Sequence, residues 1–289
     1  MNHSIDDVKL EIPPEYRANH NRIGVFNTHF QNFKNFGIPK AQLIIADVPY
    51  NISNFAYASN PSWYIDGDNK NGESELAGTS FFDTDKDFRP AEFMHFCSQM
   101  LRPEPKEKGK APCMIIFCAW DQQFYYKELG ERYGFKGCIP LVFRKNYSAQ
   151  VLKANMKIVG NCEYGLVLYR DKLPKFNNKG EMIMNCMEFP RELGMPRTHP
   201  TQKPIPLLKR LIGLFTDPDD VVIDPTAGSC SSIVAAASLQ RKAYGFEIKK
   251  QIYTQGVDNC KRWITVDMFE SSPQLEKRRR YTQSRLSDF

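Results

Sequence analysis

Short apolar runs alternate with amphipathic stretches along most of this chain, and the alternation constrains its fold more than any other feature. Short apolar runs bounded by polar residues are typical of buried strands, and longer stretches with apolar residues every three or four positions are typical of helices. Strands are predicted at residues 23–26, 43–46, 114–117, 139–143 and 165–169, and helices at 91–101, 124–133, 207–215 and 251–263. This order predicts an α/β fold with a mostly parallel, twisted sheet and helices on both faces.

The composition is consistent with one such domain. The chain has 289 residues, of which 42% are hydrophobic, so residues 1–289 are predicted to form a single domain with a full core. A polar segment at about 51–87, rich in Asn and Gly, is predicted to be a mobile loop. A basic tail at about 271–289 is predicted to lie outside the core.

Neither a membrane nor a metal is indicated. No apolar run approaches the length that spans a bilayer, and the first residues lack a signal-peptide pattern, so a cytoplasmic protein is expected. The eight cysteines are scattered without a C-x-x-C pair, which predicts reduced thiols and no zinc site. The net charge of +6 is modest, yet phosphate binding needs only a local basic face.

A carboxylate, a rigid turn and an aromatic ring follow the apolar run at 43–46, in the tetrapeptide Asp47-Val48-Pro49-Tyr50. Pro49 favours an extended Val48 and fixes its own φ, so the turn holds the acceptors of Asp47 close to the ring of Tyr50. This pair suits a flat ring with an exocyclic amino group, such as a nucleobase turned out of a duplex. A strand that ends in Asp and a turn is also common as plain architecture.

A second element, far downstream, has the pattern of a nucleotide-type site. The apolar run 221–223 leads through a turn of small residues at 224–229 into an Ala-rich stretch that is predicted to be helical. Small residues let the backbone approach a ligand, and a helix N-terminus offers N–H groups to an anion. About twenty residues later a short strand ends at Glu247, where an acid can bind ribose hydroxyls. An ordinary strand–helix–strand unit would show the same pattern.

Together these elements resemble the DNA amino-methyltransferases that use S-adenosylmethionine, in the permuted order of their β group. That family carries D-P-P-Y near the N-terminus and, later, H-P-T-Q-K-P and a D-P-F-x-G-S-G-T-like element. The counterparts here are residues 47–50, 199–204 and 224–232, in that order. The resemblance runs from residue 21 to residue 263 and implies a permuted Rossmann-like methyltransferase fold.

The resemblance implies methyl transfer to the N6 amine of a flipped adenine. The Asp47 carboxylate and the Val48 carbonyl would accept the two amino hydrogens, Pro49 would hold the turn, and Tyr50 would stack on the base. The amine would attack the sulfonium methyl in line, so positioning and polarisation carry the reaction. Asp at the first position favours adenine over the N4 amine of cytosine, whose enzymes in this family more often carry Ser there.

The same resemblance implies the contacts to S-adenosylmethionine. Asp224 and Gly228 would form the turn under the methionine part, Glu247 would bind the ribose hydroxyls, and Thr201 and Lys203 would close over the amino-acid end. The full set of implied cofactor residues is Asn27, Asp47, Thr201, Lys203, Asp224, Thr226, Ala227, Gly228, Ser229 and Glu247.

Several positions depart from the family pattern. Val48 replaces a proline, Thr226 stands where Phe is frequent, Cys230 stands where Gly is usual, and Asn27 replaces a usual Asp. The altered turn at Thr226 and Cys230 leaves a second interpretation open, a non-catalytic nucleic-acid-binding protein on the same fold. The intact Asp47, Tyr50, Lys203 and Glu247 favour the enzyme.

Contacts to double-stranded DNA are expected in two regions. Arg144, Lys145 and Asn146 form a basic element at the end of the strand 139–143, where they would meet phosphate. A short target-recognition segment is expected at about 171–197, between that strand and the residues 199–204. The sequence leaves open a homodimer, and a cognate restriction nuclease as partner.

Overall fold

The computed structural model describes residues 23–50, 88–145, 150–153, 156, 158–189 and 202–270. The predicted loop at 51–87, the basic tail at 271–289, and the site residues Asn146 and Thr201 lie outside these ranges.

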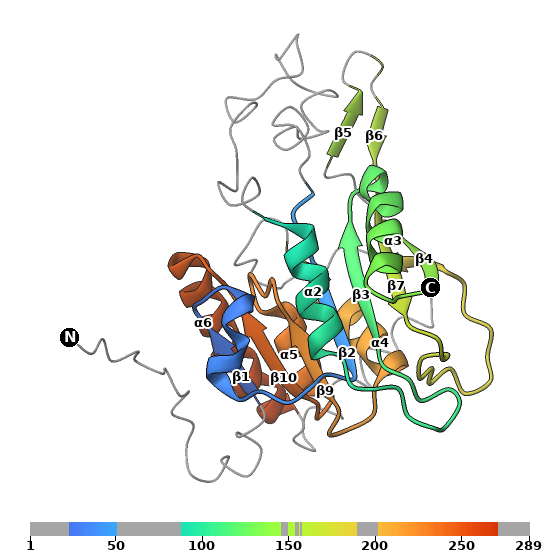
Figure 1. The fold of residues 1–289 in the computed structure, drawn as a ribbon. Coiled ribbons are helices and arrows are strands. Elements are labelled where there is room, and N and C mark those ends of the chain that lie inside the picture. Colours follow the sequence, from blue (N-terminus) through green and yellow to red (C-terminus); the bar gives the residue numbers. More distant parts are fainter. Residues whose placement is uncertain are drawn as a thin grey trace, which may run out of the picture.

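One mixed sheet organises the described residues (Figure 1). Its strands run in the order β1-β10-β9-β2-β3-β7-β4-β8 across the sheet. All neighbours are parallel except the two pairs that include β7, which is antiparallel to β3 and to β4. The mostly parallel sheet predicted from the sequence is therefore confirmed. The strands are β1 (Ile23–Phe26), β2 (Leu43–Asp47), β3 (Cys113–Cys118), β4 (Gly137–Lys145), β7 (Cys162–Tyr169), β8 (Cys186–Phe189), β9 (Val221–Asp224) and β10 (Lys242–Phe246).

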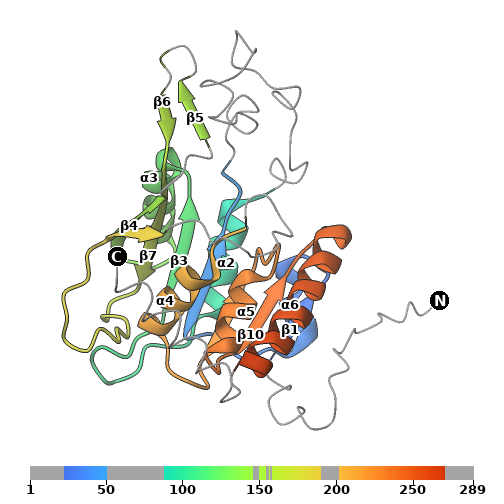
Figure 2. The same ribbon diagram turned by 180° about the vertical axis from the view of Figure 1, so that it is seen from behind.

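Helices cover both faces of the sheet, as predicted (Figures 1 and 2). Side chains alternate between the two faces along a strand. On β2, Leu43 and Ile45 pack with α4 and α5, whereas Ile44 and Ala46 pack with α2 and α3. The helices on the first face are α4 (Ile205–Phe215), α5 (Ser231–Ser238) and α6 (Lys250–Glu270), and those on the second are α2 (Pro90–Met100), α3 (Gln123–Arg132) and the 3-10 helix η2 (Phe30–Phe36).

The centre of the sheet contains a topological switch point. β9 and β2 are parallel neighbours, with Leu43 opposite Val222 and Ile44 opposite Ile223. From β9 the chain moves outward through α5 to β10, and from β2 it moves in the opposite direction through α2 to β3. In open α/β sheets, ligands bind where the connections diverge, beyond the carboxyl ends of the strands. The residues that end these two strands are Asp47 and Asp224.

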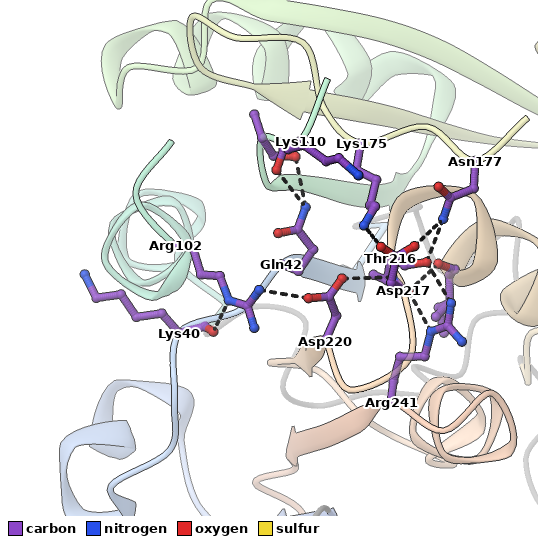
Figure 3. A network of polar contacts seen from close by, with 12 residues as sticks. Lys40, Gln42, Arg102, Lys110, Lys175, Asn177, Thr216, Asp217, Asp220 and Arg241 are labelled. Atoms are coloured by element: carbon purple, nitrogen blue, oxygen red, sulfur yellow. Dashed lines mark hydrogen bonds and ion pairs between the residues drawn. The ribbon is translucent and has the colours of Figure 1, made fainter. Parts of the chain in front are cut away.

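A polar network lies at the edge of the sheet opposite to Asp47 and Asp224 (Figure 3). Arg102, after α2, donates to Asp220, before β9, over 2.8 Å. Lys175 forms an ion pair with Asp217, and Asn177 donates to the Thr216 carbonyl over 2.9 Å. The network thus joins the loops at the amino ends of β3 and β9.

The segment at about 171–197, which is expected to recognise the target, begins at one end of the sheet strands and continues toward the other. Around Lys175, whose N–H donates to the Ala111 carbonyl over 3.0 Å, the segment lies at the edge opposite Asp47. It then continues into β8, which runs parallel to β4 and ends at Phe189, opposite Lys145. Residues 190–197 are outside the described ranges. Only its later part returns to the edge that contains Asp47, so target recognition stays a prediction for that part.

A two-stranded hairpin, β5 (Gln150–Lys153) with β6 (Ile158–Gly160), was not predicted from the sequence. It continues from β4 and β7 beyond the edge of the main sheet (Figure 1). Its strands are short and the segment has no clear alternation of apolar and polar residues, so the period-2 signal was too weak to identify them.

Candidate active site

The turn after β2 is anchored to the neighbouring strand and helix. The Val48 N–H donates to the Phe117 carbonyl over 3.2 Å, and the Val48 side chain is buried. The Pro49 carbonyl accepts a hydrogen bond from Gln122 Nε2 over 3.0 Å, while Gln122 Oε1 accepts one from the Ala119 N–H over 3.0 Å. The short 3-10 helix η5 (Trp120–Gln122) therefore holds the turn through one side chain.

Asp47 lies at the centre of the part of the site that is predicted to bind the target base, called the target half below. Its Oδ2 accepts a hydrogen bond from Lys203 Nζ over 2.7 Å. Its Oδ1 is shielded from solvent and has no hydrogen-bond partner among the described residues. A buried acceptor without a partner is costly, which indicates a position for a ligand donor. Burial raises the pKa of Asp47, Lys203 opposes this effect, and the charge of Glu163 adds to it.

Lys203 links the turn to the start of α4. Its ammonium lies 3.1 Å from the Tyr50 hydroxyl, which accepts from it, and 5.2 Å and 5.1 Å from the centroids of the Tyr50 and Phe117 rings. Burial alone would lower the pKa of Lys203, but Asp47 and Glu163 raise it well above its usual value. The side chain is therefore a buried, charged group directed at the Asp47 carboxylate. Its contact with the cofactor stays a prediction.

Glu163, near the start of β7, was not identified from the sequence. Its Oε2 lies 3.2 Å from Lys203 Nζ, and its Oε1 forms an ion pair with Lys145. Burial would raise the pKa of Glu163, but Lys203 and Lys145 lower it to about 2, so the group is ionised. The only signal in the sequence is an acid at the start of an otherwise apolar strand, and such acids are frequent.

The other part of the site, which is predicted to bind the cofactor and is called the cofactor half below, begins with a turn that Asp224 stabilises. Asp224 Oδ1 accepts from the Thr226 N–H over 2.9 Å, and Oδ2 accepts from the Ser232 hydroxyl. Burial raises the pKa of Asp224 to about 7 although these hydrogen bonds lower it. The Ala227 N–H donates to the Phe246 carbonyl over 2.9 Å. Asp224 thus stabilises the turn through both of its oxygens, and its place under the methionine part of the cofactor stays a prediction.

The next residues of the turn lie close to α6. Gly228 has φ 49° and Cys230 has φ 60°, and both values are in the left-handed region that favours glycine. A Cβ on Gly256 of α6 would lie 2.6 Å from the Gly228 carbonyl oxygen, so the helix packs directly on the turn. Asn259 donates to the Ser229 carbonyl over 2.8 Å. The turn is therefore well supported even with a cysteine at position 230.

Glu247 and Asn27 complete this half. Glu247 Oε2 accepts from the Gly228 N–H over 3.1 Å, and Oε1 accepts from the Lys249 N–H over 2.8 Å. Each oxygen keeps a second lone pair for a hydroxyl donor. Asn27 Nδ2 donates to the Glu247 and Ile248 carbonyls over 2.8 and 3.2 Å, which the aspartate usual in the family could not do. A carboxylate beside the partly buried backbone of this turn fits the ribose and methionine parts of S-adenosylmethionine.

Comparison with known proteins agrees with this arrangement. A family model described as DNA methylase, of the N6 and N4 methyltransferase type, matches residues 41–258, which include Asp47, Lys203, Asp224 and Glu247 but not Asn27. The chain belongs to the DNA methylase family. The methyl donor of these enzymes is S-adenosylmethionine, and the family predicted from the sequence is confirmed.

Two curated relatives of this DNA methylase are from Escherichia coli (strain K12). YubD is 29% identical over 217 residues, which cover 74% of this chain and 84% of YubD. The DNA adenine methyltransferase YhdJ is 31% identical over 146 residues, which cover 50% of this chain and 48% of YhdJ.

Solved structures show that the methylase has the fold of known methyltransferases. M1.HpyAVI, crystallised as a complex with SAM, has a TM-score of 0.61 at 23% identity and covers 82% of this chain and 98% of its own. The cytosine-N4-specific PvuII DNA methyltransferase has a TM-score of 0.60 at 12% identity and covers 85% of this chain and 91% of its own. The predicted Rossmann-like fold is therefore confirmed.

The basic residues predicted to meet DNA have different surroundings in the methylase. Arg144 is about half exposed, at 54%, and forms an ion pair with Glu188 on β8. Lys145 is only 15% exposed and pairs with Glu163. The phosphate contact stays a prediction, and the exposure favours Arg144 for it.

Other chemistry has little support in the described ranges. They contain no group of three or more His, Cys, Asp or Glu side chains that could hold a metal ion. All eight cysteines are described and none forms a disulfide. None of the described helices combines the length and the apolar character that a bilayer crossing requires.

Proposed function

We propose that this methylase transfers a methyl group to the exocyclic N6 amine of an adenine flipped out of double-stranded DNA. The observation that carries the proposal is the state of Asp47, whose Oδ2 is held by Lys203 while its buried Oδ1 has no partner among the described residues. An exocyclic amine has two N–H donors, and one of them fits this oxygen. The YhdJ relative, a DNA adenine methyltransferase, supports adenine as the base.

Each residue of the turn has a separate role in the proposed reaction. Asp47 Oδ1 accepts one amino hydrogen and the Val48 carbonyl accepts the other, which favours the pyramidal amine with an available lone pair. The Pro49 carbonyl is already occupied by Gln122, so the turn presents the Val48 carbonyl in a fixed position. Tyr50 provides the stacking face.

Proton transfer completes the step. When bound, S-adenosylmethionine supplies an electrophilic methyl group. The amine loses one proton as its nitrogen becomes methylated, and Asp47 Oδ1 is the group placed to hold that proton. Burial raises the pKa of Asp47, which makes it a better proton acceptor than an exposed carboxylate, while the Lys203 charge opposes that rise.

Two expectations from the sequence belong to this proposal. The enzyme would act in the cytoplasm, on double-stranded DNA, and its recognition segment would include the residues after β8. A homodimer and a cognate restriction nuclease are further predictions that activity and pull-down experiments on the full chain can test.

The experiment is nucleoside analysis by mass spectrometry of duplex DNA incubated with the enzyme and labelled S-adenosylmethionine. The expected product is N6-methyladenine. If the product is N4-methylcytosine, the target base is cytosine and not adenine. No labelled base, together with no heat on titration with S-adenosylmethionine, would support the non-catalytic alternative.

A further inference from the structure

Four charged side chains alternate in sign across the target half of the site. Lys145 pairs with Glu163, Glu163 lies 3.2 Å from Lys203, and Lys203 lies 2.7 Å from Asp47. They come from four separate segments: the end of β4, the start of β7, the residues before α4 and the end of β2. The contacts among these four side chains therefore depend on the fold and not on proximity in the sequence.

The inner members of this series are well buried. The side chains of Lys203 and Glu163 are 8% and 17% exposed, and that of Lys145 is 15% exposed. Burying charges at this depth is costly unless each has partners with good geometry. A lysine–aspartate pair alone would already balance the charges of Lys203 and Asp47, so charge balance does not explain the additional acid on β7.

The antiparallel direction of β7 provides the geometry. Because β7 runs against β3 and β4, its first residues lie at the edge where β2 ends, with Phe143 opposite Glu163 and Phe117 opposite Gly165. From this position Glu163 lies 3.2 Å from the same Lys203 ammonium that binds Asp47 over 2.7 Å. An ammonium shared by two carboxylates has fewer donors left for either one.

We propose that Glu163 is a positioning residue of methyl transfer: it holds the Lys203 ammonium so that Lys203 binds Asp47 through Oδ2 alone and leaves Oδ1 for the substrate amine. The inference rests on the proposed function, because it gives Glu163 a role in presenting the acceptor of that reaction. Glu163 itself touches neither the amine nor the methyl donor.

The charge of Glu163 has a second effect on the same carboxylate. Asp47 is faced by Lys203, Glu163 and Tyr50, and Cys118 and Asp224 lie further away. The negative charge of Glu163 raises the pKa of Asp47, although burial is the larger cause. Neutralising Glu163 therefore lowers the pKa of Asp47 and makes it a weaker proton acceptor.

The test uses Glu163→Gln in the full chain, with single-turnover and steady-state methylation of duplex DNA. We expect kcat to fall by about tenfold to a hundredfold, in the range that small misplacements of catalytic groups produce. The KM for S-adenosylmethionine should stay within about twofold, and the acid limb of the pH–kcat profile should move to lower pH. A merely structural ion pair would change stability without moving that limb.

Three companion variants isolate the effect. Glu131→Gln removes the acid of an exposed pair with Lys127 on α3 and should leave kcat and the pH profile unchanged. In a Lys203→Met background, Glu163→Gln should lower kcat far less than in the wild type, because the positioning acts through Lys203 and only the direct effect of the Glu163 charge on Asp47 remains. Glu163→Asp keeps the charge with a shorter reach; it should retain the wild-type acid limb with reduced kcat, and it replaces Glu163→Gln if that variant fails to fold.

The outcomes separate this inference from the proposed function. If the wild type forms no methylated base, the proposed function fails. If the wild type methylates DNA while a folded Glu163→Gln variant keeps the wild-type kcat and pH profile, the role of Glu163 is wrong and the proposed function stands. Additive losses of Glu163→Gln and Lys203→Met would also overturn the positioning role.

Discussion

At the scale of single residues, Val48 shows how a departure from the family pattern can be accommodated. The family has a proline at this position, but here the side chain is buried, at 2% exposure, and the N–H donates to the Phe117 carbonyl over 3.2 Å. Proline would lose that hydrogen bond. The group proposed to act on the substrate is the carbonyl, which every residue has.

Val48→Ala should therefore separate stability from activity. Removing two buried methyl groups is expected to lower the free energy of unfolding by about 1–3 kcal/mol. The kcat for DNA methylation should stay within about threefold, because the backbone carbonyl is kept. Urea denaturation and steady-state kinetics measure both; a large loss of kcat with unchanged stability would show that the side chain itself acts in catalysis.

Asp224 makes a prediction about the pH dependence of stability. Its pKa is raised from 3.8 to about 7 in the folded protein, chiefly by burial. Between these values the folded chain retains a proton that the unfolded chain has lost, so this group stabilises the fold at low pH and the contribution disappears as the pH rises through 7. The side chain of the Asp224→Asn variant does not titrate, so it makes no such contribution.

The midpoint of thermal unfolding, Tm, measures this effect. From pH 5 to pH 7.5 the Tm of the wild type should fall relative to that of Asp224→Asn, whose amide can bond both Thr226 and Ser232. The difference between the two proteins removes the contribution of the groups that they share. Parallel curves would show that the Asp224 carboxyl is ionised throughout the range.

At the scale of elements, η5 connects β3 to the turn after β2. Gln122 Nε2 holds the Pro49 carbonyl over 3.0 Å, and no motif of the sequence predicted this contact. Gln122→Ala should loosen the turn and lower kcat by about tenfold, since the Val48 carbonyl would lose its fixed position. Gln123→Ala is a matched control, because Gln123 donates to the Trp120 carbonyl over 3.2 Å and not to the turn. Equal activity of the two variants would contradict this role.

The sequence predicts the long elements well and the polar links poorly. The predicted strand 23–26 coincides with β1, and the predicted helix 91–101 overlaps α2 at 90–100, because each has a clear apolar period. The contacts of Glu163 and Gln122 depend on which strand ends meet, and this requires the strand order. Resemblance to the family predicted roles for Asp47, Lys203 and Glu247, and these roles stay predictions; it did not predict the contact between Lys203 and Asp47.

At the scale of the whole molecule, the permuted order separates the two halves of the site along the chain and joins them at the switch point between β2 and β9. The network at the opposite edge connects the same halves through Arg102 and Asp220 (Figure 3). Asp220 Oδ2 also accepts from the Asp217 N–H over 2.8 Å. This edge therefore contributes to stability at a distance from the chemistry.

Asp220→Ala should destabilise the protein by about 1–3 kcal/mol, because it leaves partly buried donors without their acceptor. The kcat should be unchanged within about twofold, since the substitution lies at the edge opposite Asp47. Glu128→Ala removes an exposed pair with Arg132 and should cost less than about 0.5 kcal/mol. A loss of kcat in Asp220→Ala at full folding would show that the two edges are coupled.

Asp47 is proposed to accept a hydrogen of the exocyclic amine of an adenine in DNA. The most direct measurement compares the wild type with Asp47→Ala, using nucleoside mass spectrometry for the product and calorimetry for S-adenosylmethionine binding. We expect N6-methyladenine from the wild type, and from the variant a loss of methylated base with cofactor affinity within about fivefold. Substantial N6-methyladenine from a folded Asp47→Ala variant would contradict this role of Asp47.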